Sequence, residues 1–221
     1  MISSLINRVA YQEIKAMATE TLRHLQSTEN AQRIKVVGIG GSLRANSHTY
    51  QALNLALQKV AAIGAEVELL DLRTMNLPFC DGDSDYTDYP DVMKLHRTVT
   101  EADSIILATP EYHGSVSGVL KNALDLMSFD QMSGKVFGLI SVLGGEHNSN
   151  SLNDLRTIVR WVHGWVIPEQ IAIAKAWQAF DGNGQLKDEK LDQRFDKFAQ
   201  SLVTNTIKLK GIDVSLMAFA N

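Results

Sequence analysis

The chain has 221 residues, enough for one large domain, and its 45% hydrophobic and 21% charged residues are typical of a globular protein. A net charge of −4 and a pI of about 5.8 argue against a general nucleic-acid binder, because no basic field attracts a polyanion. No apolar run is long enough to span a membrane. Cys80 is the single cysteine, so no disulfide forms within the chain, and a cytoplasmic setting is expected.

Residues 1–33 are predicted to form a helical extension, because Ile2, Leu5, Ile6 and Val9 recur at helical spacing. The segment lacks the basic-then-apolar order of a signal peptide. Two roles are open for it: an arm that docks on a partner subunit, or a helix that covers its own domain. Residues 34–221 are expected to form one domain, because no internal repeat or low-complexity linker interrupts them.

Segments typical of strands and of helices alternate from residue 34 onward. The first, Ile34 to Gly40, is short, β-branched and almost continuously apolar, as expected of a strand buried on both faces. Strands are predicted over 34–40, 66–72, 104–109, 135–143 and 166–174, and helices over 47–62, 117–127, 150–161 and 188–209. Helical crossovers between strands give a parallel sheet with helices on both faces. The predicted fold class is α/β: a flavodoxin-like, doubly wound, five-stranded parallel sheet of order 2-1-3-4-5, with ligands at the carboxyl ends of its strands.

Two acidic loops resemble calcium-binding loops only in part. In the stretch that starts at Asp81, the sixth position is Tyr86 and the twelfth is Val92, where a calcium loop requires Gly and Glu. The stretch that starts at Asp181 has Leu186 at its sixth position. Both are predicted to be solvated turns. No Cys/His cluster has zinc spacing either, so no metal site is expected.

The loop after the first predicted strand has the composition of a phosphate-binding loop. Gly40 and Gly41 let the chain turn and let a ligand approach closely. The donors that follow include Arg44, whose guanidinium suits phosphate oxygens. These donors are Ser42, Arg44, Asn46, Ser47 and Thr49. The alternative is a glycine turn and a helix capped by Ser47, with Arg44 in solvent.

This loop differs from the dinucleotide fingerprint G-x-G-x-x-G. Counted from Gly40, the third position is Ser42 and the sixth is Ala45. Asp71, the acid that would bind a ribose, follows about 30 residues later rather than the usual ~20. Hydroxyls that approach from many directions suit a terminal monophosphate, which favours a mononucleotide such as FMN.

The loop after the third predicted strand should face the first loop across the switch point of the sheet. Pro110 stiffens this turn, and Gly114 permits a close backbone approach. Tyr112 and His113 offer flat surfaces or hydrogen bonds to a planar ring. The alternative is that Tyr112 packs in the core and His113 lies on the surface.

Two segments carry a family resemblance: GSLRANS at 41–47 and PEYHGSVSGVLKNALD at 110–125. Together they resemble the NADPH-dependent FMN reductase family, which includes quinone, azo-dye and chromate reductases and arsenical-resistance flavoproteins. The resemblance covers about residues 34–175. It implies a flavodoxin-like fold, non-covalently bound FMN, NAD(P)H as co-substrate, and a homodimer or homotetramer.

The resemblance also implies which residues form the FMN site. Around the phosphate it places Ser42, Arg44, Asn46, Ser47, His48 and Thr49. Along the ring and the ribityl chain it places Pro110, Glu111, Tyr112, His113 and Gly114, with Gly144 and Gly145 at the pyrimidine end. Many members have Asn where this chain has His113, so the hydrogen bonding at that ring edge is left open.

The expected function is oxidoreduction: hydride passes from NAD(P)H, by way of the bound flavin, to a quinone, a flavin or another small oxidised acceptor. No nucleophile or acid–base pair is required, and Tyr112 and His113 are candidates only for orienting the acceptor. One alternative is a flavodoxin-type electron carrier without nicotinamide activity. Another is a Rossmann-type NAD(P) dehydrogenase without flavin. Steady-state NADPH consumption and flavin absorbance separate the three.

Overall fold

Five strands form one parallel sheet in the order β2-β1-β3-β4-β5, as predicted. The computed structural model describes residues 34–83, 85–146, 149–182 and 184–211, so the predicted extension over 1–33 lies outside the described residues. The strands are β1 (Lys35–Gly40), β2 (Glu66–Leu70), β3 (Ser104–Pro110), β4 (Val136–Val142) and β5 (Trp165–Ile173).

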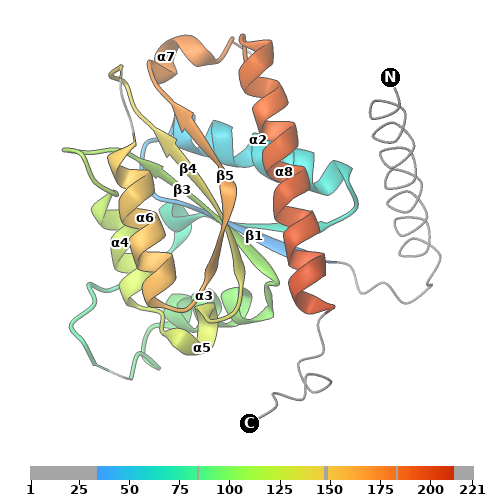
Figure 1. Ribbon diagram of the computed structural model, residues 1–221. Helices are drawn as coiled ribbons and strands as arrows, with labels where there is room; N and C mark the ends of the chain where they lie inside the picture. The colour runs from blue at the N-terminus through green and yellow to red at the C-terminus, as the bar shows by residue number, and fades with distance from the viewer. Residues whose placement is uncertain (1–33, 84, 147–148, 183, 212–221) are drawn as a thin grey trace. The chain divides into compact units, whose positions relative to one another are not determined.

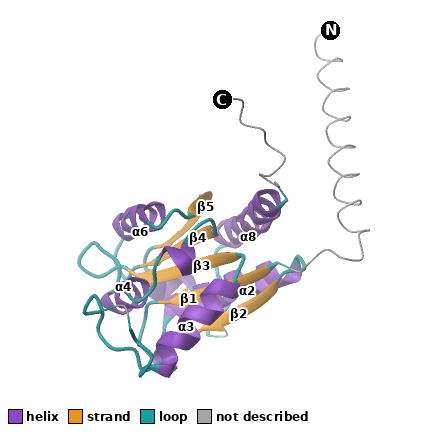
Figure 2. Ribbon diagram, turned by 90° about the horizontal axis from the view of Figure 1, so that it is seen from below, coloured by secondary structure: helices purple, strands orange, loops and turns teal. Residues whose placement is uncertain are grey.

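Helices cover both faces of the sheet, which lies between them (Figure 1). They are α2 (His48–Ala62), α3 (Pro90–Glu101), α4 (Gly118–Asp125), α5 (Phe129–Met132), α6 (Asn150–Trp161), α7 (Ala176–Ala179) and α8 (Glu189–Lys210), with one 3-10 turn, η1 (Leu72–Thr74). Helices α2 and α8 pack together on one face, while α3, α4 and α6 lie on the other (Figure 2). This is the arrangement that right-handed crossovers impose on this strand order.

The three inner strands, β1, β3 and β4, are largely apolar because both of their faces are buried. Along β1, Val36 points into the core under α2 and α8, whereas Val37 and Ile39 point into the core under α3, α4 and α6. All residues of β3 and β4 are buried. The carboxyl ends of these central strands, and the loops that follow them, form the edge of the sheet where ligands bind in such folds.

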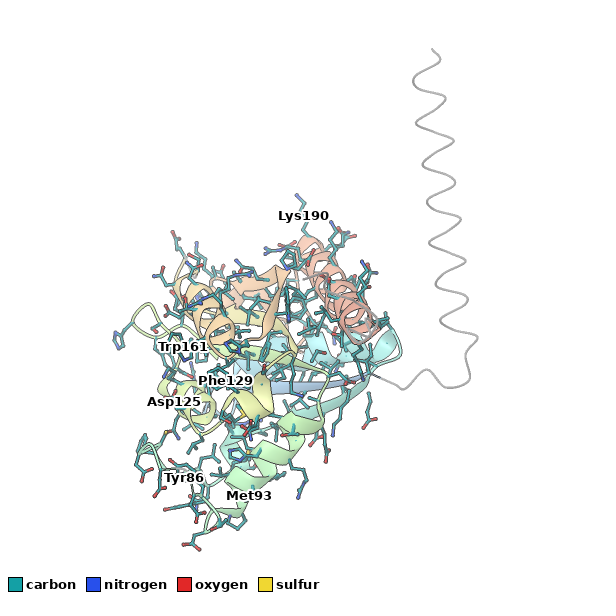
Figure 3. All side chains as sticks on the ribbon, turned by 60° about the horizontal axis from the view of Figure 1, so that its bottom comes forward. Tyr86, Met93, Asp125, Phe129, Trp161 and Lys190 are labelled. Atoms are coloured by element: carbon teal, nitrogen blue, oxygen red, sulfur yellow. The ribbon has the colours of Figure 1, made fainter. Side chains whose placement is uncertain are left out.

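Helix α3 was not predicted, although it supplies the crossover from β2 to β3. It begins at Pro90, a residue suited to the first turn of a helix, and buries Val92, Leu95 and Val99. Figure 3 shows Tyr86 on the segment before this helix and Met93 on it. The predicted second strand also ends early, because Leu72 belongs to η1. Helices α5 and α7 have four residues each, too few for a periodic pattern.

The predicted cap of the first helix is confirmed: the Ser47 hydroxyl accepts a hydrogen bond of 3.3 Å from the Tyr50 amide. In the acidic loop before α3, the Asp81 carboxylate accepts from the Asp83 amide and the Tyr86 hydroxyl, which makes it part of a turn. Among the described residues, no group of three metal-ligating side chains occurs. No helix in the described ranges is long and apolar enough to span a membrane.

Candidate functional site

A cavity of about 280 Å³ lies at the carboxyl edge of the sheet. Four loops reach it, those that follow β1, β3, β4 and β5. The predicted residues that line it are Ser42, Arg44, Ser47, His48, Thr49, Pro110, Glu111, Tyr112 and Gly144. Val142, Leu143, Ala176 and Trp177 also line it and were not predicted. The sheet thus brings together the two segments that carry the family resemblance, as their places at the switch point required.

The loop after β1 supplies the donors that an anion needs. Ser42, Ser47 and Thr49 are buried at the cavity, whereas Arg44 is exposed at its edge. The 15-residue helix α2 starts here and has no acidic residue in its first turn. The positive end of its dipole therefore faces the cavity without a competing carboxylate. These hydroxyls, one guanidinium and a helix N-terminus fit the phosphate of a mononucleotide.

The glycines of this loop are required by packing, a reason that the sequence analysis did not include. A β-carbon at Gly40 would lie 2.8 Å from the ring of Tyr50. At Gly41 it would lie 2.5 Å from the Ser117 hydroxyl and 2.7 Å from the β-carbon of Leu120. Both glycines are needed because α2 and α4 approach the backbone of this turn too closely for a side chain.

The Glu111 carboxylate, although Glu111 lines the cavity, is hydrogen-bonded to the start of α6. It is buried, and its Oε2 accepts hydrogen bonds from the Ser151 amide at 3.0 Å and the Ser151 hydroxyl at 2.9 Å. The Ser151 hydroxyl also lies 2.7 Å from that of Ser141 on β4. A carboxylate at the first turn of α6 is favoured by the helix dipole. Glu111 therefore fixes the start of α6 beside the cavity.

Tyr112 to Ser115 form a tight turn whose tip is His113-Gly114. The amide of Tyr112 donates to the carbonyl of Ser115, and that of Ser115 to the carbonyl of Tyr112, both at 3.1 Å. His113 has φ 52° and Gly114 has φ 78°. His113 and Gly114 are not among the residues that line the cavity, whereas Tyr112 lines it and is 49% exposed. The family's usual Asn at this position suits the left-handed backbone that the turn requires.

Helix α7 brings Trp177 to the cavity from beyond β5. The amide of Lys175 donates to the Gly145 carbonyl at 2.8 Å, and that of Ala176 to the Leu143 carbonyl at 3.0 Å. These bonds hold α7 against the loop after β4. The Gly145 carbonyl accepts one of these bonds. Of the two glycines predicted to lie at the pyrimidine end of the ring, only Gly144 lines the cavity. No sequence pattern marked Trp177, because its helix is a single turn.

Two polar residues near the first loop do not face the cavity. Asn46 is exposed in the turn before α2 and does not line the cavity. The Asp71 carboxylate is paired with the Arg73 guanidinium at 2.6 Å, and this hydrogen bonding lowers the pKa of Asp71. Asp71 is therefore paired with Arg73, which is a second argument, besides its spacing, against the ribose-binding acid of a Rossmann-type dehydrogenase.

A family model described as NADPH-dependent FMN reductase matches residues 34–178. The chain belongs to this family. Its members reduce small acceptors, and the chain is accordingly an FMN-dependent NAD(P)H oxidoreductase with FMN and NADPH as cofactors. The sheet order 2-1-3-4-5 is that of flavodoxin-like folds and not the 3-2-1-4-5 order found in Rossmann dehydrogenases.

Individual proteins agree with this assignment. The NADPH-dependent FMN reductase ArsH of Rhizobium meliloti (strain 1021) is 28% identical over 201 residues, which cover 89% of this chain and 80% of that protein. The FMN-dependent NADPH-azoreductase of Staphylococcus aureus (strain USA300) is 34% identical over 74% of this chain and 90% of its own. Among solved structures, FerB, a flavoenzyme NAD(P)H:(acceptor) oxidoreductase from Paracoccus denitrificans, superposes with a TM-score of 0.64. It is 25% identical and covers 77% of this chain and 98% of its own.

We predict that Arg44→Ala weakens FMN binding roughly 10- to 100-fold, because it removes a charged hydrogen-bond donor for the phosphate. The melting temperature of the flavin-free protein should stay unchanged, since Arg44 is exposed. Fluorescence titration with FMN measures the affinity. Arg160→Ala, an exposed arginine in the last turn of α6, is the control. Unchanged FMN affinity in Arg44→Ala would reject the role given to Arg44.

We predict that His113→Asn leaves FMN affinity unchanged within about twofold and does not lower the melting temperature, because Asn tolerates left-handed backbone well. His113→Val should lower the melting temperature, since a β-branched residue is strained at φ 52°. Flavin titration and thermal denaturation of both variants make the test. A large loss of FMN affinity in His113→Asn at unchanged stability would show that the imidazole itself contacts the flavin.

Proposed function

We propose that this cavity holds FMN with its phosphate at the start of α2, and that a small acceptor with a conjugated, planar ring system docks against aromatic side chains at its rim. The observation that carries the proposal is the meeting of several loops at one cavity, with donors from after β1, Tyr112 from after β3 and Gly144 from after β4. The Staphylococcus aureus relative is named an azoreductase, which supports a conjugated acceptor.

The protein's part in this function is binding and orientation. Arg44 and the hydroxyls of the first loop would hold the phosphate, and the segment from Pro110 to Tyr112 would border the ring. Bound FMN supplies the chemistry of accepting a hydride from the nicotinamide and passing two electrons to an acceptor. The backbone at Gly144 would lie at the pyrimidine end of the ring, where amide donors favour negative charge.

Tyr112 and Trp177 are proposed as the surfaces on which the acceptor stacks. The loops after β3 and β5 flank the loop after β4, because β4 lies between those strands. Tyr112 is 49% exposed and Trp177 64% exposed, although both line the cavity. When a planar ligand covers a large aromatic face that was exposed to water, the free energy of binding becomes more favourable. Tyr112, rather than His113, therefore takes the orienting role, since His113 sits at the tip of the turn.

We also propose a homodimer or homotetramer in the cytoplasm. The family resemblance supports the oligomer. The exposed side chains of Trp161 and Trp165 supply apolar surface that a partner subunit would cover. Cys80 is a free thiol, which suits a reducing compartment. Light scattering of the purified protein measures the oligomeric state.

We predict that the purified flavoprotein oxidises NADPH with menadione, a planar quinone, and with ferricyanide, a compact non-aromatic acceptor. Trp177→Ala should raise the KM for menadione about tenfold, because a stacking surface is lost. The rate with ferricyanide should stay unchanged. Steady-state assays with each acceptor at saturating NADPH make the comparison.

The matched control is Phe79→Ala. Phe79 is 88% exposed in the loop between η1 and α3 and does not line the cavity. It should leave the KM for both acceptors unchanged. A holoprotein that consumes no NADPH with either acceptor contradicts the proposed function. An equal loss with menadione and ferricyanide in Trp177→Ala contradicts the stacking role alone.

A further inference from the structure

A second arginine, Arg73, contacts the phosphate loop and does not line the cavity. It belongs to η1, directly after β2. Its guanidinium contacts three groups from different parts of the chain. Nε and Nη2 donate to the two carboxylate oxygens of Asp71 at 2.8 and 2.6 Å, and Nη1 donates to the carbonyl of Ala45 at 3.2 Å. The guanidinium carbon lies 4.0 Å from the ring centroid of Tyr50.

The contact with Ala45 links Arg73 to the phosphate loop, because Ala45 directly follows Arg44. Asp71 binds one edge of the planar guanidinium, and the Tyr50 ring lies against its face. The Nη1 group is thereby aimed at the Ala45 carbonyl. With these partners, the guanidinium is held against the backbone of the loop and does not line the cavity.

Tyr50 fixes the same loop at its two ends. Its hydroxyl donates to the Gly40 carbonyl at 2.9 Å and accepts from the Leu72 amide at 3.1 Å. Its amide donates to the Ser47 hydroxyl at 3.3 Å. Burial raises the pKa of the Tyr50 phenol, so the hydroxyl keeps the proton that it donates. The loop is therefore held at Gly40, at Ala45 and at Ser47 by one connected cluster.

We propose that Arg73 is a positioning residue for the FMN phosphate: by holding the Ala45 carbonyl, it keeps Arg44 and the loop hydroxyls directed at one point. The inference rests on the proposed function, since it requires the phosphate to bind at this loop. Positioning of this kind is specific to the phosphate. A flavin without a phosphate makes no use of the loop, so its affinity does not depend on Arg73.

The test compares FMN with riboflavin, which has the same ring and ribityl chain but no phosphate. The flavin-free full-length chain is titrated with each flavin, and quenching of flavin fluorescence gives the dissociation constant. The variants are Arg73→Ala, Arg73→Lys and the control Arg97→Ala, which removes the same charge from an exposed position on α3. Melting temperatures are measured alongside.

Arg73→Ala is expected to weaken FMN binding about tenfold and to leave riboflavin binding unchanged. Arg73→Lys should show a similar loss, because one ammonium group cannot hold Asp71 and the Ala45 carbonyl in the geometry of the guanidinium fork. Arg97→Ala should bind both flavins like the wild type. Arg73→Lys keeps the positive charge. It therefore tests whether the guanidinium geometry is needed for FMN binding, even where Arg73→Ala fails to fold.

Three results would overturn the inference. Unchanged FMN affinity in both Arg73 variants would show that the loop keeps its shape without the guanidinium. Equal losses for FMN and riboflavin would show a general structural role. Full FMN affinity in Arg73→Lys would show that charge alone matters. A wild-type protein that binds riboflavin as tightly as FMN would instead overturn the phosphate site, and with it the proposed function.

Discussion

A hydrogen bond of 2.6 Å from the Ser117 hydroxyl to the Gly41 carbonyl joins the two loops on which the cavity depends. The Gly41 amide donates in turn to the Ala108 carbonyl of β3 at 2.8 Å. Ser117 also caps α4, and its own amide donates to the Thr109 hydroxyl at 3.0 Å. One buried cluster therefore sets the end of β1, the end of β3 and the start of α4. The phosphate loop and the Tyr112 turn can face one cavity because this cluster leaves them no freedom to separate.

Much of the fold was predictable because strands buried on both faces leave a plain signal. The apolar runs around Val36, Ile106 and Ile140 predict the three inner strands, and helical crossovers between strands then permit few strand orders. Helix α3 was missed although Pro90 and the helical spacing of Val92, Leu95 and Val99 mark it in the sequence. Helix α7 was missed because a single turn has no period.

The composition of the site was more predictable than the direction of its side chains. The two matched segments do meet, yet Glu111 turns to Ser151 and His113 takes a turn position. Side-chain direction depends on packing partners far along the chain, and residue type alone does not reveal it. Trp177 could not be predicted for the same reason. It lies at the cavity because backbone hydrogen bonds hold α7 against the loop after β4.

The two arginines near the first loop, Arg44 and Arg73, have different proposed roles. Arg44 is exposed beside buried hydroxyls and a helix N-terminus, where an anion would be bound directly. Arg73 is committed to Asp71, Ala45 and Tyr50, and its effect on a ligand passes through the backbone. A crystal structure of the chain with FMN would show directly where the phosphate binds. We expect the phosphate within hydrogen-bond distance of Arg44 and the hydroxyls of Ser42 and Ser47. A phosphate bound elsewhere, with this loop empty, would rule out the phosphate site.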